Sequence, residues 1–415
     1  MEALFGLLLC LTVSPIGLLY GIVMLCKFPQ KTRQWLPFIV YSLGILAYSY
    51  NPIVEDDLMR YFYKAQEYAG LPLDRVFYDA SGVNQYDVLT WIYATWSWLI
   101  GQIGAVHLLP MVSIMTIYGI AFYITADFAK AFKGEKYIPF VVLFQICMLP
   151  LPAIISNVRN VWAFSLVILA AYLDLIRRKR NILVLLLYIL PGFIHSSAFL
   201  LLFLRFLCRV GSKIIVPLFA GSLVLPQIID FLYEHASGIS AFGTVGLFIN
   251  LSILRLYWYI HDTGETEWAQ QVASSLFQRI NRIVMVSFAV LACLLILTWI
   301  KKNIEERYNS FLNYMMIINI GVIAFTWFTA PHFWRLSAAS FIGVGIVLFP
   351  ILTNHSPNRP SIVKLVKILL PFYMIAGLLV QFWPIQYIIH PSEWVTEAIT
   401  TNIFTILFDV LKGIL

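Results

Sequence analysis

The stretch AVHLLPMVSIMTIYGIAFYITA, residues 105–126, decides the fold, because it contains no aspartate, glutamate, lysine or arginine. A helix needs about 20 apolar residues to cross roughly 30 Å of hydrocarbon, so this stretch predicts a membrane-spanning helix. Similar apolar stretches recur from one end of the chain to the other. We expect spans at 3–26, 35–52, 105–126, 138–155, 160–176, 214–233, 283–300, 309–329, 336–353 and 365–383.

The composition also indicates a membrane protein. Of the 415 residues, 60% are hydrophobic and 12% are charged, and the mean hydropathy is +0.83. Soluble domains are about 45–50% apolar and about 25% charged. Because the apolar surplus runs along the whole chain, a soluble enzyme with one anchor is excluded. We predict an all-α, polytopic integral membrane helical bundle, with a single transmembrane domain over residues 1–415 and no soluble domain.

The net charge of +7 orients the chain. Lysine and arginine concentrate in the cytoplasmic loops of membrane proteins, so the excess does not indicate a nucleic-acid partner. This rule places six basic clusters in the cytoplasm, at 27–33, 130–136, 177–180, 205–213, 301–307 and 359–367. The first outer loop is then 52–104 and the second large outer loop is 234–282. The five cysteines lie in or beside apolar stretches, so we expect no disulfide, no metal site and no cofactor.

Two segments depart from the pattern of simple spans. Residues 87–104 are apolar, but counting them as a span breaks the alternation of basic loops, and they carry Trp91, Trp96 and Trp98. Such aromatics favour the interface, so we expect an outer-face amphipathic helix or a re-entrant segment. Residues 181–208 break at Pro191-Gly192, and two halves of about 13 residues reach only about 20 Å each. We expect a short hairpin that lines a water-accessible cavity, and about 12 membrane helices in all.

Four polar segments fall on the outer side in this topology, at 51–61, 156–160, 191–197 and 331–335. Their candidate site residues are Asp56, Asp57, Arg60, Tyr61, Asn157, Arg159, Asn160, His195, Ser196, His332 and Arg335, to which Arg279 and Arg282 of the second outer loop are added. For His332, Arg279 and Arg282 the structural interpretation is preferred.

The other candidates also have structural interpretations. Arg159 and Arg335 could mark helix ends and extend to lipid head groups, and His195 could be a packed histidine. Asp56 and Asp57 could cap a helix that starts directly after them, or bind a divalent ion as in membrane sugar-phosphate transferases. No third ligand at a recognisable spacing supports the ion. Two arginines on the outer side oppose the positive-inside bias, which favours a functional role for them.

The outer arginines and the histidine suit chemistry on a phosphate. A guanidinium is a rigid, permanently charged fork that matches phosphate oxygens. Two or three of them can hold a pyrophosphate and stabilise its charge as it leaves, without a metal. A histidine beside an incoming hydroxyl can take its proton near neutral pH. These groups fit the displacement of a lipid pyrophosphate by a sugar hydroxyl, with the lipid entering from the bilayer.

Three ordered motifs link these segments to a known family. The block Asn157-Val-Arg159-Asn160-Val-Trp-Ala-Phe-Ser opens a span, the basic turn 177–180 follows, and Gly192-Phe-Ile-His195-Ser-Ser-Ala-Phe returns on the outer side. This order resembles the EpsG/Wzy-type polysaccharide polymerases. One departure is Asn160, where many members carry glutamine.

Two further motifs extend the resemblance to about residues 45–345. The stretch Asp57-Leu-Met-Arg60-Tyr61 looks like the family's D-x-x-x-Y motif. Arg335 is similar to the family's late arginine before one of the last spans. The motifs are short, and their order and spacing carry the resemblance.

The resemblance implies a membrane glycosyltransferase with a GT-C-like bundle, facing outward from the bacterial inner membrane. It would polymerise undecaprenyl-pyrophosphate-linked repeat units into an O-antigen, capsule or exopolysaccharide. Arg159 and Arg335 would hold the donor pyrophosphate, His195 would be the base, and the other candidates would bind substrate, with Asp57, Arg60 and Tyr61 on the glycan or acceptor side. The implied partners are the lipid-linked glycan donor and acceptor and membrane lipid, and a chain-length regulator is allowed.

Three other functions stay open. An O-antigen ligase-like transferase would use the same donor, although the long outer loop expected of a ligase would here be only 234–282. A flippase or other transporter would show inverted repeats and polar groups near the bilayer midplane, whereas here the polar clusters gather toward one surface. A structural membrane subunit without chemistry is the third alternative.

Overall fold

The computed structural model describes residues 2–54, 56–79, 82–83, 89–208, 213, 217, 221, 224–239, 243, 246, 249–250, 253–254, 257, 276–325, 332–353, 361–388 and 391–414. The chain divides into two compact units, Met1–Leu202 with Phe341–Leu415 and Phe203–Ser340. The described parts are helical, apart from the two-residue strands β1 (Tyr78–Asp79) and β2 (Gly82–Val83), which pair antiparallel. The helical class predicted from the sequence is therefore confirmed.

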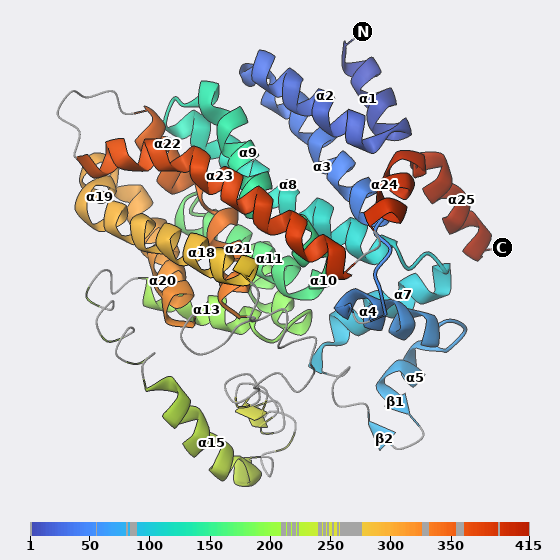
Figure 1. The fold of residues 1–415 in the computed structure, drawn as a ribbon. Coiled ribbons are helices and arrows are strands. Elements are labelled where there is room, and N and C mark those ends of the chain that lie inside the picture. Colours follow the sequence, from blue (N-terminus) through green and yellow to red (C-terminus); the bar gives the residue numbers. More distant parts are fainter. Residues whose placement is uncertain are drawn as a thin grey trace. The chain divides into compact units, whose positions relative to one another are not determined.

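The first unit contains the helices at both ends of the chain (Figure 1). The first group is α1 (Glu2–Thr12), α2 (Ser14–Lys27), η1 (Pro29–Lys31), α3 (Thr32–Tyr48), α4 (Asp57–Glu67), α5 (Leu73–Phe77) and α7 (Trp91–Ile103). The second group is α8 (Leu108–Ala131), η2 (Glu135–Tyr137), α9 (Ile138–Met148), α10 (Leu151–Ser156), α11 (Val158–Leu175), α12 (Ile182–Ile189) and η3 (Leu190–Phe193). The last group is α22 (Gly345–Thr353), α23 (Ser361–Ile388), α24 (Pro391–Thr400) and α25 (Ile403–Ile414).

The second unit has its own set of helices. They are α15 (Leu225–Ile239), α18 (Leu276–Leu295), the π-helical η6 (Ile296–Ile300), α19 (Lys301–Asn303), η7 (Glu306–Tyr308) and α20 (Asn309–Phe325). The helices α13 (Ala198–Leu207) and α21 (His332–Ile342) contain the points at which the chain passes from one unit to the other.

Several described helices are long and apolar enough to cross a membrane. Five qualify singly: Leu108–Ala131, Val158–Leu175, Arg279–Asn303, Glu306–Phe325 and Ser361–Gln381. Two bent pairs, Arg335–Ile342 with Gly345–Thr353 and Pro391–Thr400 with Ile403–Gly413, raise the number to seven if each pair is one span. A membrane protein is thereby supported. The expected total of about 12 helices stays a prediction, since part of 214–233 lies outside the described residues.

Three of the expected single spans are each divided into two helices: 3–26 and 138–155 near a proline, and 336–353, which bends by 49° between Ile342 and Gly345. The stretch 3–26 forms α1 and α2, separated at Val13, whose φ of −140° and ψ of 88° are not helical. Pro15 lies in the first turn of α2, where its missing N–H costs no hydrogen bond. The stretch 138–155 is divided in the same way into α9 and α10, with Pro150 as the N-cap of α10.

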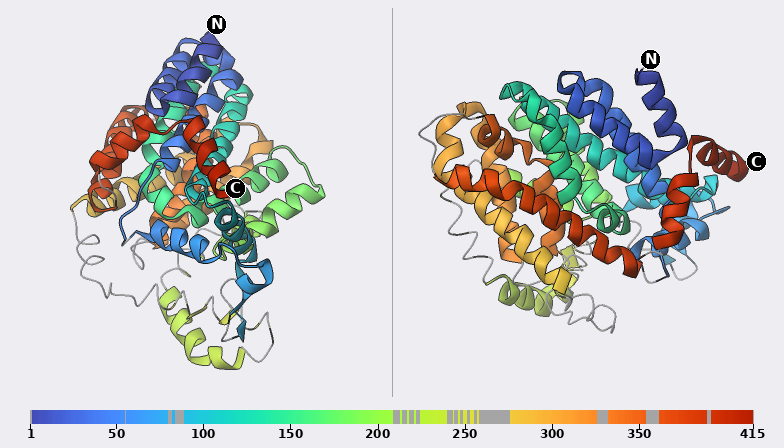
Figure 2. Two further views of the ribbon diagram at one scale, coloured as in Figure 1. Left: turned by 90° about the vertical axis from the view of Figure 1, so that its right-hand side faces the viewer. Right: turned by 45° about the horizontal axis from the view of Figure 1, so that its top comes forward.

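Helix α8 is central to the first unit, where it packs against α3, α9, α10, α11 and α22. The neighbouring α1, α2 and α3 pack on one another near the N-terminus (Figure 2). Between the spans, Gln145 of α9 accepts a hydrogen bond from the Thr125 hydroxyl at 2.9 Å and donates one to the Phe341 carbonyl at 3.0 Å. Buried polar groups need such partners in an apolar surrounding.

The two irregular segments are made of short helices. Residues 87–104 contain α7, whose 13 residues reach about 20 Å and are too short to cross the bilayer. Helix α7 packs against α4, α5 and α25. Residues 181–208 are divided into α12, η3 and α13, with the turn at His195–Ser197 between the last two. The placement of both segments at the outer surface stays a prediction.

Candidate active site

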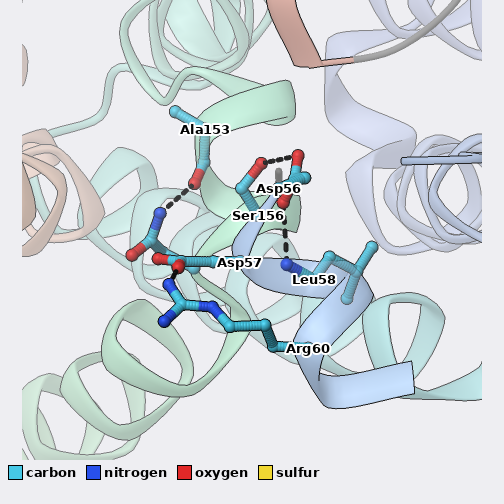
Figure 3. A network of polar contacts seen from close by, with 7 residues as sticks. Asp56, Asp57, Leu58, Arg60, Ala153 and Ser156 are labelled. Atoms are coloured by element: carbon cyan, nitrogen blue, oxygen red, sulfur yellow. Dashed lines mark hydrogen bonds and ion pairs between the residues drawn. The ribbon is translucent and has the colours of Figure 1, made fainter. Parts of the chain in front are cut away.

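Asp56 fixes the start of α4. Its backbone is extended, as the N-cap position requires, and its Oδ1 accepts a hydrogen bond from the Leu58 N–H at 2.7 Å. Its Oδ2 accepts hydrogen bonds from the Ser156 hydroxyl at 2.7 Å and from the Tyr50 hydroxyl at 3.1 Å. Figure 3 shows how this carboxylate joins the first turn of α4 to the end of α10. The capping role considered from the sequence is thus present, together with a tertiary link.

Burial governs the electrostatics of this link, because Asp56 is only 2% exposed. Desolvation raises the pKa of Asp56, and the three hydrogen bonds that it accepts oppose the shift. Since both carboxylate oxygens are bound by protein donors, the geometry gives Asp56 a positioning role.

The next carboxylate, Asp57, forms an ion pair with Arg60 on the same helix (Figure 3). The Arg60 side chain is 74% exposed and that of Asp57 is 31% exposed. An exposed pair one turn apart contributes about 1 kcal/mol at most. Arg60 is therefore available to a ligand at little cost in stability. In the described part of the chain, no group of three or more His, Cys, Asp or Glu side chains could hold a metal ion.

Arg159 lies at the centre of the predicted site. It is in the first turn of α11 and only 8% exposed. Its guanidinium carbon lies 4.6 Å from the ring centre of Tyr61 and 4.9 Å from that of Tyr93. The two rings are 5.6 Å apart at an angle of 71°, so they form an edge-to-face pair around the cation. Three helices, α4, α7 and α11, thus meet at one guanidinium.

The two asparagines beside Arg159 have different environments. Asn157 is the N-cap of α11, and its amide donates to the Ala153 carbonyl at 3.5 Å. Asn160 is buried, and its Oδ1 has no hydrogen-bond partner among the residues that the structure describes. Trp162 continues the aromatic wall, with its ring 6.4 Å from that of Trp96 on α7. This segment therefore offers one cation and a buried amide oxygen next to aromatic rings.

His195 lies in the turn that follows η3. The helix η3 packs against α11 and α7, the helices that carry Arg159 and Tyr93. The Phe193 ring lies 6.0 Å from the Trp91 ring on α7. A Cβ at Gly192 would overlap the Phe199 ring, so this tight turn requires glycine. Ser196 is half-buried in the same turn.

These contacts bring three of the four predicted polar segments together within the first unit. Helices α4 and α11 and the turn that starts in η3 also contain motifs on which the family resemblance rests. The profile of the EpsG family matches residues 35–389 of the chain. The chain belongs to the EpsG family. No curated protein and no solved structure matches the chain significantly.

Membership of the EpsG family suggests a membrane protein of the polysaccharide-polymerase type. The match includes every candidate site residue, from Asp56 to Arg335.

The remaining candidates of this EpsG-family chain belong to the second unit. Arg335 is half-buried in α21, and His332 begins that helix, with its side chain outside the described residues. Arg279 is exposed and Arg282 is half-buried near the start of α18. Their participation in a site with Arg159 stays a prediction.

Sequence reasoning missed the roles of Tyr50, Ser156 and Tyr93 in the site. Tyr93 was expected at the membrane interface, yet it is buried and contacts Arg159. The buried residues of α7 include Tyr93, Ser97 and Ile100, which recur at helical spacing. That periodicity could have indicated a helix face that packs on protein.

Proposed function

We propose that the chain is a membrane glycosyltransferase that polymerises undecaprenyl-pyrophosphate-linked oligosaccharide repeat units into a surface polysaccharide. The observation that carries this proposal is the Arg159 guanidinium held between Tyr61 and Tyr93 at the start of α11. Family membership narrows the reaction to the polysaccharide-polymerase type. The complete chain would form a GT-C-like bundle of about 12 membrane helices in the bacterial inner membrane, with this site facing outward.

The local electrostatics favour a diphosphate. The N-terminus of an α-helix carries a partial positive charge and unsatisfied N–H groups, and it attracts anions. Arg159 adds a full positive charge in the first turn of α11, and the two tyrosine rings keep its fork in place. A lipid diphosphate would supply the negative charge that this arrangement attracts. Arg335 is proposed as the second arginine on the same diphosphate.

The reaction needs no metal in this scheme. A hydroxyl oxygen of the incoming repeat unit attacks the anomeric carbon of the growing chain, and the bond from that carbon to the phosphate oxygen breaks. The undecaprenyl pyrophosphate leaves with both bonding electrons, and arginines stabilise its charge. The hydroxyl proton passes to a base, for which the sequence predicts His195. Asp57, Arg60 and Tyr61 of α4 would contact the glycan or acceptor.

The test is polymer length in a host that lacks its own polymerase. The host is complemented with wild type, Arg159→Ala, Arg335→Ala or the control Arg307→Ala, at matched membrane levels. Arg307 is half-exposed, pairs with Glu305 and belongs to a basic cluster that is expected in the cytoplasm. We expect full ladders from wild type and Arg307→Ala, and single repeat units from the other two variants, because transition-state contacts to leaving charge are worth about 100-fold or more in rate.

The other functions give different products. Polymer that accumulates on its lipid carrier would indicate a ligase, and repeat units retained on the cytoplasmic side would indicate a transporter. Full ladders from both Arg159→Ala and Arg335→Ala would refute the proposed role of the arginines.

A further inference from the structure

The ring of His195 is held by the residue two positions ahead. The Ser197 backbone N–H donates to His195 Nδ1 at 3.3 Å. The Ser197 hydroxyl oxygen lies 2.6 Å from the same nitrogen. The turn that contains both residues is closed by the bond from the Ala198 N–H to the His195 carbonyl at 3.0 Å.

The backbone donor favours one tautomer of the His195 ring. A backbone N–H can only donate, so the Nδ1 atom that receives it must present a lone pair. The Ser197 hydroxyl then also donates to Nδ1. A neutral imidazole carries one proton, which is left on Nε2. The local backbone thus selects the Nε2–H form of His195.

This tautomer opposes a role as base at either nitrogen. Nε2 already holds its proton, so it has no lone pair for a hydroxyl proton. Protonation at Nδ1 would direct a new N–H against the Ser197 backbone N–H, and two donors would then face each other. An Nε2–H group is instead a hydrogen-bond donor, and donors to the developing charge of a leaving group stabilise the transition state.

We infer that His195 acts as a neutral Nε2–H donor to a diphosphate oxygen of the lipid-linked substrate. The general base is then another group, in place of the His195 that the sequence predicts for this role. The inference rests on the proposed function for its ligand. The helix η3, which precedes the histidine, packs on α11 and α7, where Arg159 contacts Tyr93. A neutral donor would add a hydrogen bond to the diphosphate without adding another buried positive charge to the three helices that pack together.

The tautomer can be measured without activity. The protein is labelled with ¹⁵N at the imidazole nitrogens and studied by NMR in detergent micelles. Of the seven histidines, His195 is assigned as the signal absent from His195→Gln. We expect a directly bonded proton on Nε2 and an unprotonated Nδ1. A proton on Nδ1, or one shared equally by both nitrogens, would overturn the inference.

The ligand is tested next by adding undecaprenyl pyrophosphate to the micelles. We expect the Nε2–H signal of His195 to shift in wild type, whereas no shift would overturn the donor role. Ser197→Ala is the matched variant, because it removes the hydroxyl and keeps the backbone N–H. Its Nε2–H form should persist, and a change to Nδ1–H would show that the backbone contact does not select the tautomer.

Polymer ladders then separate a donor from a base. A glutamine amide can place an N–H near the position of Nε2 but cannot accept a proton at neutral pH. We expect His195→Gln to retain polymerisation within about 10-fold of wild type and His195→Ala to lose it. A general base contributes about 100- to 10,000-fold, so a glutamine variant as inactive as alanine would refute the donor role. If ladders were unaffected by Arg159→Ala as well, the proposed function would fail while the NMR result still stood.

Discussion

Replacing Asp56 with alanine should weaken the protein through the link between α4 and α10. Asp56 accepts hydrogen bonds from the Leu58 N–H at the start of α4 and from the hydroxyls of Ser156 and Tyr50. Ser156 is 100 residues away in the sequence, so the carboxylate joins two helices rather than one turn. Its loss would release the part of α4 that places Tyr61.

The size of the effect follows from these three bonds. Loss of a helix cap costs about 1 kcal/mol. Each buried hydroxyl that loses its partner costs about 1 kcal/mol or more. Removing a buried carboxylate also regains part of its desolvation penalty, so we expect a net loss of about 2 kcal/mol in the free energy of unfolding. That is roughly a 30-fold change in the ratio of folded to unfolded protein.

Asp56→Asn should be milder than Asp56→Ala and should also change the pH dependence. Burial raises the pKa of Asp56 above its ordinary value of 3.8, so the folded protein binds this proton more tightly than the unfolded chain does. This proton's contribution to the free energy of unfolding is complete below the ordinary pKa. It is lost as the pH rises through the pKa that Asp56 has in the folded protein. Asparagine does not titrate, so this component should be missing from the Asp56→Asn variant.

The assay is unfolding in mixed micelles with increasing denaturing detergent, followed by tryptophan fluorescence at several pH values. Asp57→Ala is the control, because it removes a neighbouring carboxylate whose partner, Arg60, is exposed. Its effect should stay below about 1 kcal/mol. Equal unfolding midpoints for Asp56→Ala and Asp57→Ala would refute the proposed link, and so would an asparagine variant as unstable as alanine.

Two further predictions concern the contacts around α4 and α7. Tyr61→Phe keeps a ring beside Arg159 and should change the KM for the lipid-linked donor less than twofold. Tyr61→Leu should raise this KM about fivefold, because one cation–π contact is worth about 1 kcal/mol. Equal KM values for the two variants would contradict the contact. A Cβ at Gly101 of α7 would overlap the Ala65 carbonyl oxygen of α4, so Gly101→Ala should reduce the yield of folded protein in size-exclusion chromatography. Gly119→Ala, whose Cβ would meet its nearest neighbour at 3.9 Å, should behave as wild type, and equal yields would show that α4 and α7 are not closely packed.

Hydropathy predicted the membrane class and the position of several spans, because apolar length is a local property of the sequence. It did not predict the breaks at Val13 and Pro150, although Pro15 and Pro150 were visible as residues that start a new helix. Hydropathy is averaged over about the length of one membrane span, and each half of a broken stretch is shorter than that length. A proline inside an apolar run is therefore the stronger signal for where such a helix ends.

The site was predicted in part for a similar reason. Asp57, Arg60, Tyr61 and Arg159 could be chosen from the sequence because each is a polar or aromatic residue in an ordered motif. That Tyr61 contacts Arg159 could not be read in this way, since the two are 98 positions apart and only tertiary packing joins them. The motifs thus indicated which residues matter, and the packing of α4, α7 and α11 shows which of them are in contact.

The same packing suggests why an arginine occupies this position. A positive charge in the first turn of α11 faces the positive end of the helix dipole, which is unfavourable by a few tenths to about 1 kcal/mol. The faces of two aromatic rings offset this, because their negative quadrupoles attract the guanidinium. Stability alone would be served as well by a neutral side chain at residue 159. A substrate with two adjacent phosphates gains from the dipole and the guanidinium together, so the charge has its largest effect when the diphosphate is bound or leaving.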